Sequence, residues 1–259
     1  MAKKSKYLIA NWKMNKDEKE SLEFYKQLAK KTKTRSKVKF IIAAPYTDLP
    51  GLKKIATAKI KLAAQNLYPG VSGAFTGEIS GKMLKPLVDY VIVGHSERRR
   101  LMNEDDDLIN QKVKSALDFQ LKPIICFGET AEEKEQGLSK QVIQDQLAGC
   151  LADVSSEELK NIIFAYEPVW AISTTPGASG EGDNPENAQV MHRLVRHNLE
   201  QTYGKVAGDE LTVIYGGSVK PKNAESFLSM PDIDGALIGG ASLQIDSFFE
   251  IIEAANNLM

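Results

Sequence analysis

Two side chains suited to proton transfer directly follow short apolar runs of the sequence. Glu167 lies between Tyr166 and Pro168, and the proline favours an extended backbone that would fix the direction of the carboxylate. A carboxylate on an apolar rim is suited to act as a general base. His95 opens a predicted helical turn, and a helix N-terminus disfavours a charged imidazolium. We therefore predict a base at Glu167 and a neutral His95 that donates a hydrogen bond.

An ammonium group and two glycine pairs mark where an anion could bind. Lys13 follows Asn11 and Trp12 at the end of the first apolar run, where its charge could face an anionic substrate. The segments Gly216-Gly217-Ser218 and Gly239-Gly240 follow the last two apolar runs, and each is expected to open a helix. Glycine lets the backbone approach a ligand closely, and helix N-termini present free N–H groups. This pattern predicts a phosphate site.

Each of these residues also has a structural explanation when it is taken alone. Glu167 could pair with a nearby Lys or Arg, His95 could cap a helix or fill the core, and Lys13 could be a solvated surface lysine. The other two histidines, His192 and His197, do not share one helix face at their spacing, and we interpret both as packing or surface residues. No His, Asp and Glu cluster has metal-ligand spacing, and no nucleotide-binding glycine motif occurs. We therefore predict no metal and no cofactor.

Eight short runs rich in Val, Ile and Ala are the elements that must position these residues. They are apolar on successive residues rather than alternating, which is typical of parallel strands covered on both faces. The runs are Tyr7–Ala10, Phe40–Ala44, Ile60–Ala64, Tyr90–Val93, Pro123–Phe127, Ile162–Tyr166, Leu211–Tyr215 and Gly235–Ile238. Helical patterns lie between them, the clearest being Glu18–Lys31, Asp106–Phe119, Asn187–Tyr203 and Ser247–Leu258.

Eight such β-then-α units within 259 residues predict an α/β protein with a closed (β/α)8 barrel, the TIM barrel, as a single domain over residues 1–259. A doubly wound open sheet is the alternative, although it usually has fewer strands. In a barrel, the chemistry lies at the C-terminal ends of the strands, and the ends of the seventh and eighth strands commonly hold a phosphate. The glycine pairs occur at those two positions.

Composition restricts the partners and the location. The 33 basic residues nearly balance the 34 acidic ones, which excludes a chain that holds nucleic acid mainly by neutralising phosphates. No apolar run approaches the roughly 18 residues that cross a bilayer, and the apolar stretch after the first lysines is too short for a signal peptide. Cys126 and Cys150 are too few for a disulfide framework. We expect a cytoplasmic protein with no nucleic-acid or membrane partner.

The ordered set of motifs resembles the triosephosphate isomerase family. The similar segments run in order from about residue 7 to the C-terminus, and as a set they are specific. They are Asn11–Asn15, Gly94–Arg99, Tyr166–Ala171, Tyr215–Val219 and Gly239–Leu243. The segment Gly73–Glu78 also resembles the interface loop of that family.

The resemblance implies cofactor-independent interconversion of dihydroxyacetone phosphate and D-glyceraldehyde 3-phosphate through an enediolate. Glu167 would be the base, His95 would polarise the carbonyl as the electrophile, and Lys13 would supply positive charge. Asn11 would position the substrate, and Glu97 would contact Lys13.

Further residues receive roles only from this resemblance. Beside Asn11 and Lys13, the phosphate would be bound by Ser173, Gly217, Ser218, Gly239 and Gly240. The resemblance also implies a homodimer, in which Thr76 reaches into the second subunit and Gln65 lies near that contact. Arg99 and Glu129 would form a supporting ion pair.

The sequence departs from the family in the long loop Ile172–Asn184. Loops of this length are usually lids or binding loops, with a disordered spacer as the alternative. The family usually continues Trp-Ala-Ile with Gly-Thr-Gly-Lys or Gly-Thr-Gly-Arg, whereas this chain has Ser173-Thr174-Thr175-Pro176-Gly177. We expect an altered loop geometry and the same reaction. Two other functions stay open: a barrel enzyme that acts on a related sugar phosphate, and a barrel kept only as a binding module.

Overall fold

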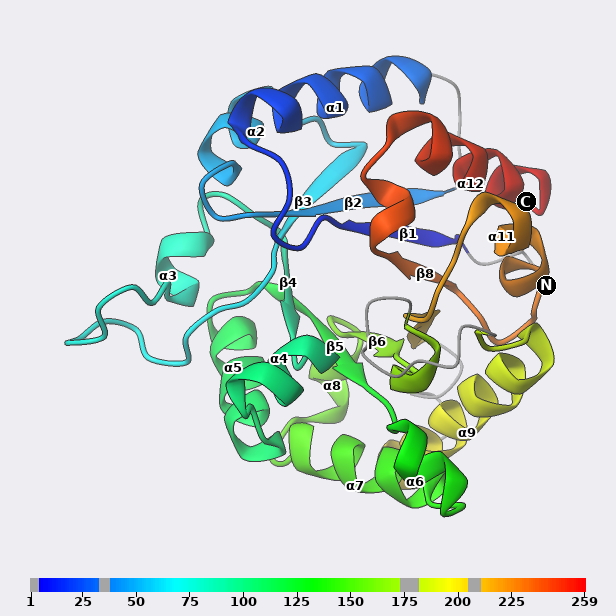
Figure 1. The fold of residues 1–259 in the computed structure, drawn as a ribbon. Helices are drawn as coiled ribbons and strands as arrows, with labels where there is room; N and C mark the ends of the chain where they lie inside the picture. Colours follow the sequence, from blue (N-terminus) through cyan, green and yellow to red (C-terminus); the bar gives the residue numbers. More distant parts are fainter. Residues whose placement is uncertain (1–4, 33–37, 173–181, 205–210) are drawn as a thin grey trace.

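Eight parallel strands close into a barrel in sequence order (Figure 1). The computed structural model describes residues 5–32, 38–172, 182–204 and 211–259. The strands are β1 Tyr7–Asn11, β2 Lys39–Ala44, β3 Ile60–Ala64, β4 Tyr90–Val93, β5 Lys122–Phe127, β6 Ile163–Tyr166, β7 Thr212–Tyr215 and β8 Gly235–Ile238. Because β1 pairs in parallel with both β2 and β8, the predicted barrel is confirmed and the open sheet is wrong. The domain span 1–259 stays a prediction.

Helices surround the barrel and cover its outer face (Figure 1). They are α1 Glu18–Lys31, α2 Leu49–Ile55, α3 Gly81–Leu84, α4 Ser96–Met102, α5 Asp106–Asp118, α6 Ala131–Glu135, α7 Ser139–Cys150, α8 Ser156–Leu159, α9 Pro185–Tyr203, α11 Pro221–Leu228 and α12 Ile245–Asn257, with 3-10 helices η1 Val169–Ala171 and η2 Gly240–Ser242. The four helices predicted from the sequence are all present. None of the described helices is both long enough and apolar enough to span a bilayer.

Side-chain caps set the starts of the two helices that the sequence pattern marks best. Asp17 and Glu20 form a reciprocal capping box at the start of α1, which satisfies two free backbone donors. Asp105 caps α5 by accepting a hydrogen bond from the Leu108 amide at 2.9 Å. Asn103 instead ends α4 in the left-handed conformation. Residues 103–105 therefore separate the two helices α4 and α5.

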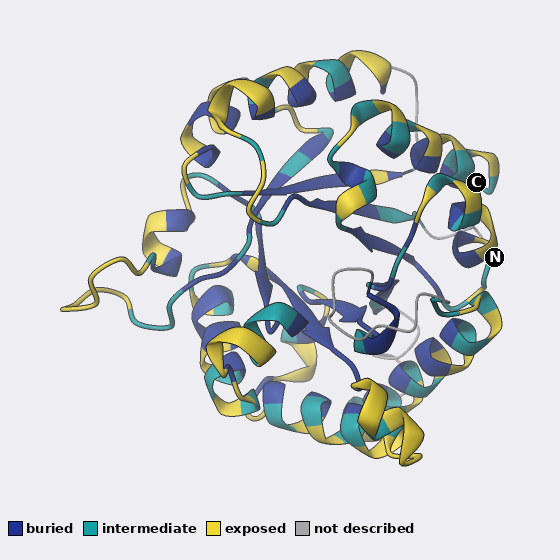
Figure 2. Ribbon diagram, in the orientation of Figure 1, coloured by how far each residue is buried: buried dark blue, intermediate teal, exposed yellow. Residues whose placement is uncertain are grey.

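Both faces of the strands are buried, as Figure 2 shows by the dark blue barrel. One cluster of apolar side chains fills the interior of the barrel and includes Ile9, Ile124 and Ile214. A larger cluster lies between the strands and the helices and includes Leu8, Phe164 and Val213. Neighbouring residues of one strand thus belong to different apolar layers, which explains the continuous apolar runs of the sequence.

A charged network ties α9 to the N-terminal ends of β7 and β8, at the end of the barrel away from the glycine pairs. The Asp234 carboxylate accepts hydrogen bonds from Arg196 Nη2 at 2.5 Å and from the Val213 amide at 2.9 Å. Arg196 also donates to Leu211 O at 3.0 Å, and Asp232 Oδ1 lies 3.2 Å from its Nε. Asp234 is buried, so its charge depends on these partners.

We predict that Asp234→Asn destabilises the protein without changing its activity per folded molecule. The substitution leaves a nearly buried guanidinium without its main counter-charge, an effect of about 3 kcal/mol on the free energy of unfolding. Urea denaturation measures it. The control is Asp153→Asn, which removes an exposed ion pair with Lys114 and should change stability by less than about 0.5 kcal/mol. Equal stability of the two variants would contradict the assignment.

Candidate active site

A pocket of about 370 Å³ opens at the C-terminal ends of the strands and gathers most of the predicted site residues. Its lining comes from the first, fourth, sixth, seventh and eighth strands and from the loops that follow them. The predicted residues that line it are Asn11, Lys13, His95, Glu167, Gly217, Ser218, Gly239 and Gly240. Ser173 lies outside the described residues. Among the described residues, no cluster of His, Cys, Asp and Glu could hold a metal ion.

Lys13 reaches the pocket from a strained backbone. Its φ angle is +53°, a conformation that L-residues other than Asn and Asp seldom adopt. The Lys13 amide donates to Asn11 Oδ1 at 3.1 Å, and Gln65 Nε2 donates to Lys13 O at 2.9 Å. These two bonds hold the peptide groups on both sides of Lys13, and they stabilise its strained conformation.

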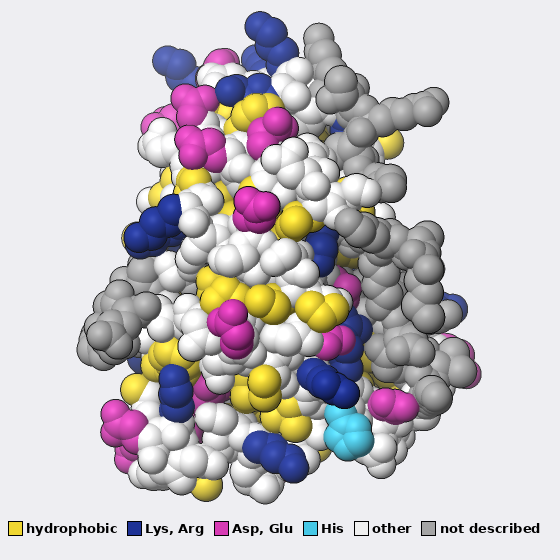
Figure 3. All heavy atoms as spheres, turned by 90° about the vertical axis from the view of Figure 1, so that its right-hand side faces the viewer, with side chains coloured by type: hydrophobic (Ala, Val, Ile, Leu, Met, Phe, Trp, Pro, Cys, Tyr) yellow, Lys and Arg dark blue, Asp and Glu magenta, His cyan; other side chains and the backbone are white. Residues whose placement is uncertain are grey.

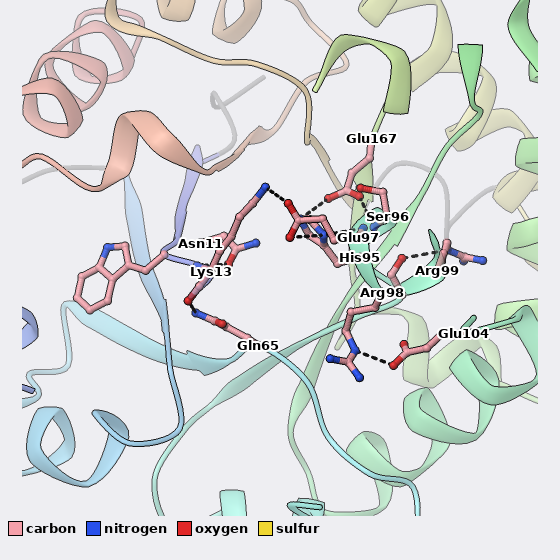
Figure 4. A network of polar contacts seen from close by, with 12 residues as sticks. Asn11, Lys13, Gln65, His95, Ser96, Glu97, Arg98, Arg99, Glu104 and Glu167 are labelled. Carbon is pink, nitrogen blue, oxygen red and sulfur yellow. Dashed lines mark hydrogen bonds and ion pairs between the residues drawn. The ribbon is translucent and has the colours of Figure 1, made fainter. Parts of the chain in front are cut away.

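The Lys13 ammonium is paired with a carboxylate beside the pocket. Its Nζ lies 2.5 Å from Glu97 Oε1, and both side chains are partly exposed. Figure 4 shows Lys13 and Glu97 pointing toward one another, with His95 next to them. Glu97 does not itself line the pocket. It therefore neutralises and orients Lys13 from the side.

The hydrogen bonding of His95 defines which ring nitrogen carries the proton. His95 is the N-cap residue of α4, and its Nδ1 accepts a hydrogen bond from the Glu97 amide at 3.3 Å. An imidazole nitrogen that accepts cannot carry a proton, so the neutral ring bears its proton on Nε2. That nitrogen lies 3.3 Å from Glu167 Oε1. His95 thus presents a donor toward the carboxylate side of the pocket.

The Glu167 carboxylate is almost fully buried, with 1% of the residue exposed. Its Oε2 accepts a hydrogen bond from the Ser96 amide at 2.9 Å, as drawn in Figure 4. Gly216 packs directly against it, because a Cβ added to Gly216 would lie 2.6 Å from Glu167 Cγ. Below the carboxylate lies Cys126, and burial followed by the Glu167 charge raises the pKa of that thiol well above its usual value. The thiol therefore stays protonated.

The glycine pairs form another end of the pocket, which begins at Gly216 beside Glu167, although they do not open α-helices as the sequence suggested. Gly217 lies over Tyr215, since a Cβ there would come within 2.2 Å of the tyrosine hydroxyl. The helix α11 begins only at Pro221, whose ring is suited to the first helical position. Gly239 precedes the short 3-10 helix η2, and α12 starts later. Backbone groups of two turns therefore line this end.

The expected ion pair between Arg99 and Glu129 is wrong. Arg99 Nη1 instead pairs with Asp106 at 2.6 Å, and its Nε donates to Gly94 O at 3.0 Å. Glu129 accepts hydrogen bonds from the Tyr166 hydroxyl and from Trp170 Nε1, the latter at 2.8 Å. Burial raises the pKa of Glu129, and these donors oppose the rise. Neutral donors thus satisfy Glu129, while the long Arg99 side chain reaches the start of α5.

The two predicted interface residues lie in different surroundings. Gln65 is partly buried, and its amide donates to Lys13 O and Ala43 O, both at 2.9 Å. Thr76 is exposed in the loop between β3 and α3, which projects far from the barrel (Figure 1). Gln65 therefore supports the backbone of Lys13, and the interface role of both residues stays a prediction.

Sequence reasoning missed several groups of the pocket. Lys220 and Ser247 line it beside the glycine turns, and the Ser96 amide holds Glu167. Lys220 lies two residues after the predicted Ser218, so its closeness to the glycine pair could have indicated that it lines the pocket. The Ser96 contact left no signal in the sequence, because any residue could supply the amide.

The fold and the pocket define a closed α/β barrel whose strand ends bring a carboxylate, an imidazole and an ammonium group into one pocket with two glycine turns. A sequence profile of the triosephosphate isomerase family matches residues 6–255. The triosephosphate isomerase of Fusobacterium nucleatum is 47% identical over 251 residues, covering 96% of this chain and 98% of that protein. That of Protochlamydia amoebophila is 42% identical over 253 residues, covering 97% and 94%. The chain belongs to the triosephosphate isomerase family and is an isomerase.

His192 supports the pocket from below as a neutral core residue. It is fully buried, its ring meets Tyr166 edge-on at 5.7 Å, and Tyr215 lies 6.1 Å away. Its Nδ1 lies 2.7 Å from Ala188 O. Burial lowers the pKa of His192 to about 4. The packing interpretation of this histidine is confirmed, and the two tyrosines it supports lead into Glu167 and Gly216.

We predict that His192 makes stability depend on pH between about 6.5 and 4. In this window the unfolded chain binds the proton while the folded protein does not, so the free energy of unfolding falls as the pH falls. From a shift of 6.5 to about 4, the contribution is about 3 kcal/mol.

Urea denaturation of wild type and His192→Gln at pH 7 and pH 4.5 measures this dependence. The variant should be less stable at pH 7 but should lose less stability on acidification. His197→Gln, at an exposed position of the same helix, is the control and should behave as the wild type. Parallel pH curves for wild type and His192→Gln would rule the assignment out.

Proposed function

We propose that this protein interconverts dihydroxyacetone phosphate and D-glyceraldehyde 3-phosphate, with Glu167 as the base and His95 as the electrophile. Glu167 removes a proton from the carbon beside the carbonyl, and the electron pair of the broken C–H bond moves toward the carbonyl oxygen. The resulting enediolate accepts a hydrogen bond from His95 Nε2. Glu167 then gives the proton to the carbon that carried the carbonyl, while the hydroxyl proton of the first carbon moves by way of His95 to the other oxygen, so that the new carbonyl forms at the first carbon. No electron leaves or enters, so the reaction needs no cofactor.

The geometry around Glu167 and His95 carries this proposal. The carboxylate and the protonated ring nitrogen lie 3.3 Å apart at one wall of a pocket that also contains Lys13. A substrate that enters between them places its C–H beside the carboxylate and its oxygen beside Nε2. Glu167 must then leave the Ser96 amide, which it accepts from at 2.9 Å. An electrophile that is already oriented needs little reorganisation in the transition state.

Backbone amides and two positive charges support phosphate binding at the other end. Gly217, Ser218, Gly239 and Gly240 line that end with Lys220, and glycine turns let amides approach an anion closely. A Cβ added at Gly239 would lie 3.5 Å from Lys13 Cε, so Lys13 lies between the reacting end and the phosphate end. Ser173 stays a proposed phosphate contact outside the described residues.

We predict that wild type isomerises glyceraldehyde 3-phosphate and that Glu167→Gln loses the activity while keeping the fold. Glu167→Asp should retain a residual rate, about 100-fold lower in kcat, because its carboxylate stops about one methylene short of the substrate carbon. A coupled assay that consumes dihydroxyacetone phosphate measures both variants.

Cys126→Ser is the matched control, because it alters a buried neighbour of Glu167 without removing the carboxylate. Full activity of Glu167→Gln would exclude Glu167 as the base. A folded wild type that turns over another sugar phosphate but not the triose phosphates would favour the related barrel enzyme. A folded wild type without any turnover would favour the binding module.

We also propose that the protein is a homodimer that works in the cytoplasm without a nucleic-acid partner. Apolar side chains stand exposed around the projecting loop and near Lys13, with Met14 at 95% and Phe75 at 47% exposure. Exposed apolar patches often mark protein–protein interfaces. Cys126 and Cys150 are buried free thiols, which is typical of reducing compartments. On the face in Figure 3, basic and acidic side chains are interspersed.

We predict that wild type sediments as a dimer and that Thr76→Arg sediments as a monomer. The arginine would place a charge without a counter-ion inside the proposed interface, which is strongly unfavourable. Sedimentation velocity at micromolar concentration measures the mass. Val190→Arg changes an exposed apolar residue of α9 and should leave the dimer intact. A dimeric Thr76→Arg, or a monomeric wild type, would refute the interface.

A further inference from the structure

Lys16 has a strained backbone that the mechanism does not explain. Its φ angle is +72°, a conformation in which glycine is favoured and other L-residues are strained. It lies between β1 and α1, three residues after Lys13. A strained residue persists only where its side chain or its surroundings compensate. The contacts of the Lys16 side chain therefore indicate its role.

The Lys16 ammonium bonds to the turn that follows β8. Its Nζ donates to Leu243 O at 2.8 Å, and Leu243 is the residue that ends η2. A cation is favourable at the carbonyl end of a helical turn. The turn itself begins at Gly239 and is held by the Ser242 hydroxyl, which donates to Ile238 O and Gly239 O. Lys16 thus holds the far end of a glycine turn that lines the pocket.

Two aromatic rings hold the same ammonium from the side of the first loop. Nζ lies 5.0 Å from the centroid of Phe24 and 5.4 Å from that of Trp12. Both rings are buried and meet edge-on at 5.2 Å. Desolvation lowers the pKa of Lys16, and Glu20 opposes this change. A partly buried cation with a carbonyl and two aromatic partners is a specific contact rather than a solvated lysine.

The bond from Lys16 to Leu243 O joins the two segments that meet across the pocket. The loop after β1 carries Asn11 and Lys13, and the turn after β8 carries Gly239 and Gly240. Inside the pocket these segments approach through Lys13 and Gly239. Outside the pocket they are joined through Lys16 and Leu243. The two contacts together fix the spacing between the Lys13 charge and the glycine turn.

We propose that Lys16 is a positioning residue for the phosphate group of the substrate. It holds the turn after β8 against the loop after β1, so that Lys13 and the glycine amides face one phosphate monoester together. Lys16 does not line the pocket, so it acts through these two segments. The inference rests on the proposed function for its substrate, and it extends that function to a residue outside the pocket.

The test combines three substitutions of Lys16 with steady-state kinetics and direct binding of inorganic phosphate. Lys16→Met keeps the stem over the rings and removes the ammonium. Lys16→Gly removes the ammonium and also relieves the φ strain, so its melting temperature should exceed that of Lys16→Met. Lys16→Arg restores a cation that can reach the carbonyl. Lys19→Met is the matched control, because Lys19 is an exposed lysine of α1.

Lys16→Met and Lys16→Gly should each raise KM and the dissociation constant of inorganic phosphate about fivefold, with kcat within about twofold, as expected for loss of one coupling contact. Lys16→Arg should recover most of the affinity, and Lys19→Met should match wild type. A purely structural role would instead make phosphate affinity follow the melting temperature, so that Lys16→Gly binds better than Lys16→Met.

Wild-type phosphate affinity in Lys16→Met and Lys16→Gly would overturn the proposal, and so would a fall in kcat at unchanged KM. Calorimetry with inorganic phosphate needs no turnover, so a failure of the proposed function can be distinguished from a failure of the role proposed for Lys16. If wild type binds phosphate but does not isomerise triose phosphates, the proposed function fails, and the role of Lys16 is still decided by the phosphate affinities of the variants.

Discussion

The pairing of β1 with β8 is the constraint on which the rest of the structure depends. It closes the sheet, because Tyr7 through Ala10 lie beside Gly235 through Ile238 in parallel register. Closure brings the first and last strand ends to the same rim, so Lys13 and Gly239 become neighbours although nearly the whole chain separates them. The Glu167 carboxylate and the His95 imidazole follow β6 and β4 at the same rim. Without closure, these side chains and the two glycine turns would have no common pocket.

Burial determines what the polar groups of this rim can do. The Glu167 carboxylate is nearly inaccessible, and its hydrogen-bond donor is a backbone amide, that of Ser96. An amide holds the carboxylate without an opposing charge, and the Lys13 ammonium in the same pocket is paired with Glu97. In the proposed reaction, the carboxylate therefore exchanges its amide partner for a substrate proton without breaking an ion pair with a lysine or arginine. Glu129, by contrast, is fixed by two neutral donors and belongs to the support of η1.

The sequence was sufficient to predict the barrel and most of the pocket, because its buried parallel strands appear as continuous apolar runs and the polar residues follow at their ends. It could not assign partners to long side chains. Arg99 reaches Asp106 rather than Glu129, and spacing does not distinguish two acids within reach of one guanidinium. It also could not place the helix starts after the glycine pairs, where Pro221 rather than Gly217 sets the boundary of α11. The hydrogen bond from the Ser96 amide to Glu167 could not be predicted either, because a backbone amide is the same in nearly every residue type.

Two residues of the loop after β1 adopt a backbone conformation that their residue type disfavours. Lys13 and Lys16 both have positive φ within one short loop, where glycine would be less strained. The first is held by the hydrogen bond that its amide donates to Asn11 and by the one that its carbonyl accepts from Gln65. The second is held by its bond to Leu243 O and by two aromatic rings. The Lys16 side chain reaches the turn after β8, and the Lys13 side chain passes beside Gly239 of that turn and pairs with Glu97. A loop that served only to connect β1 to α1 would have no reason to hold two cations in such conformations, whereas the proposed phosphate site beside the last strand gives it one.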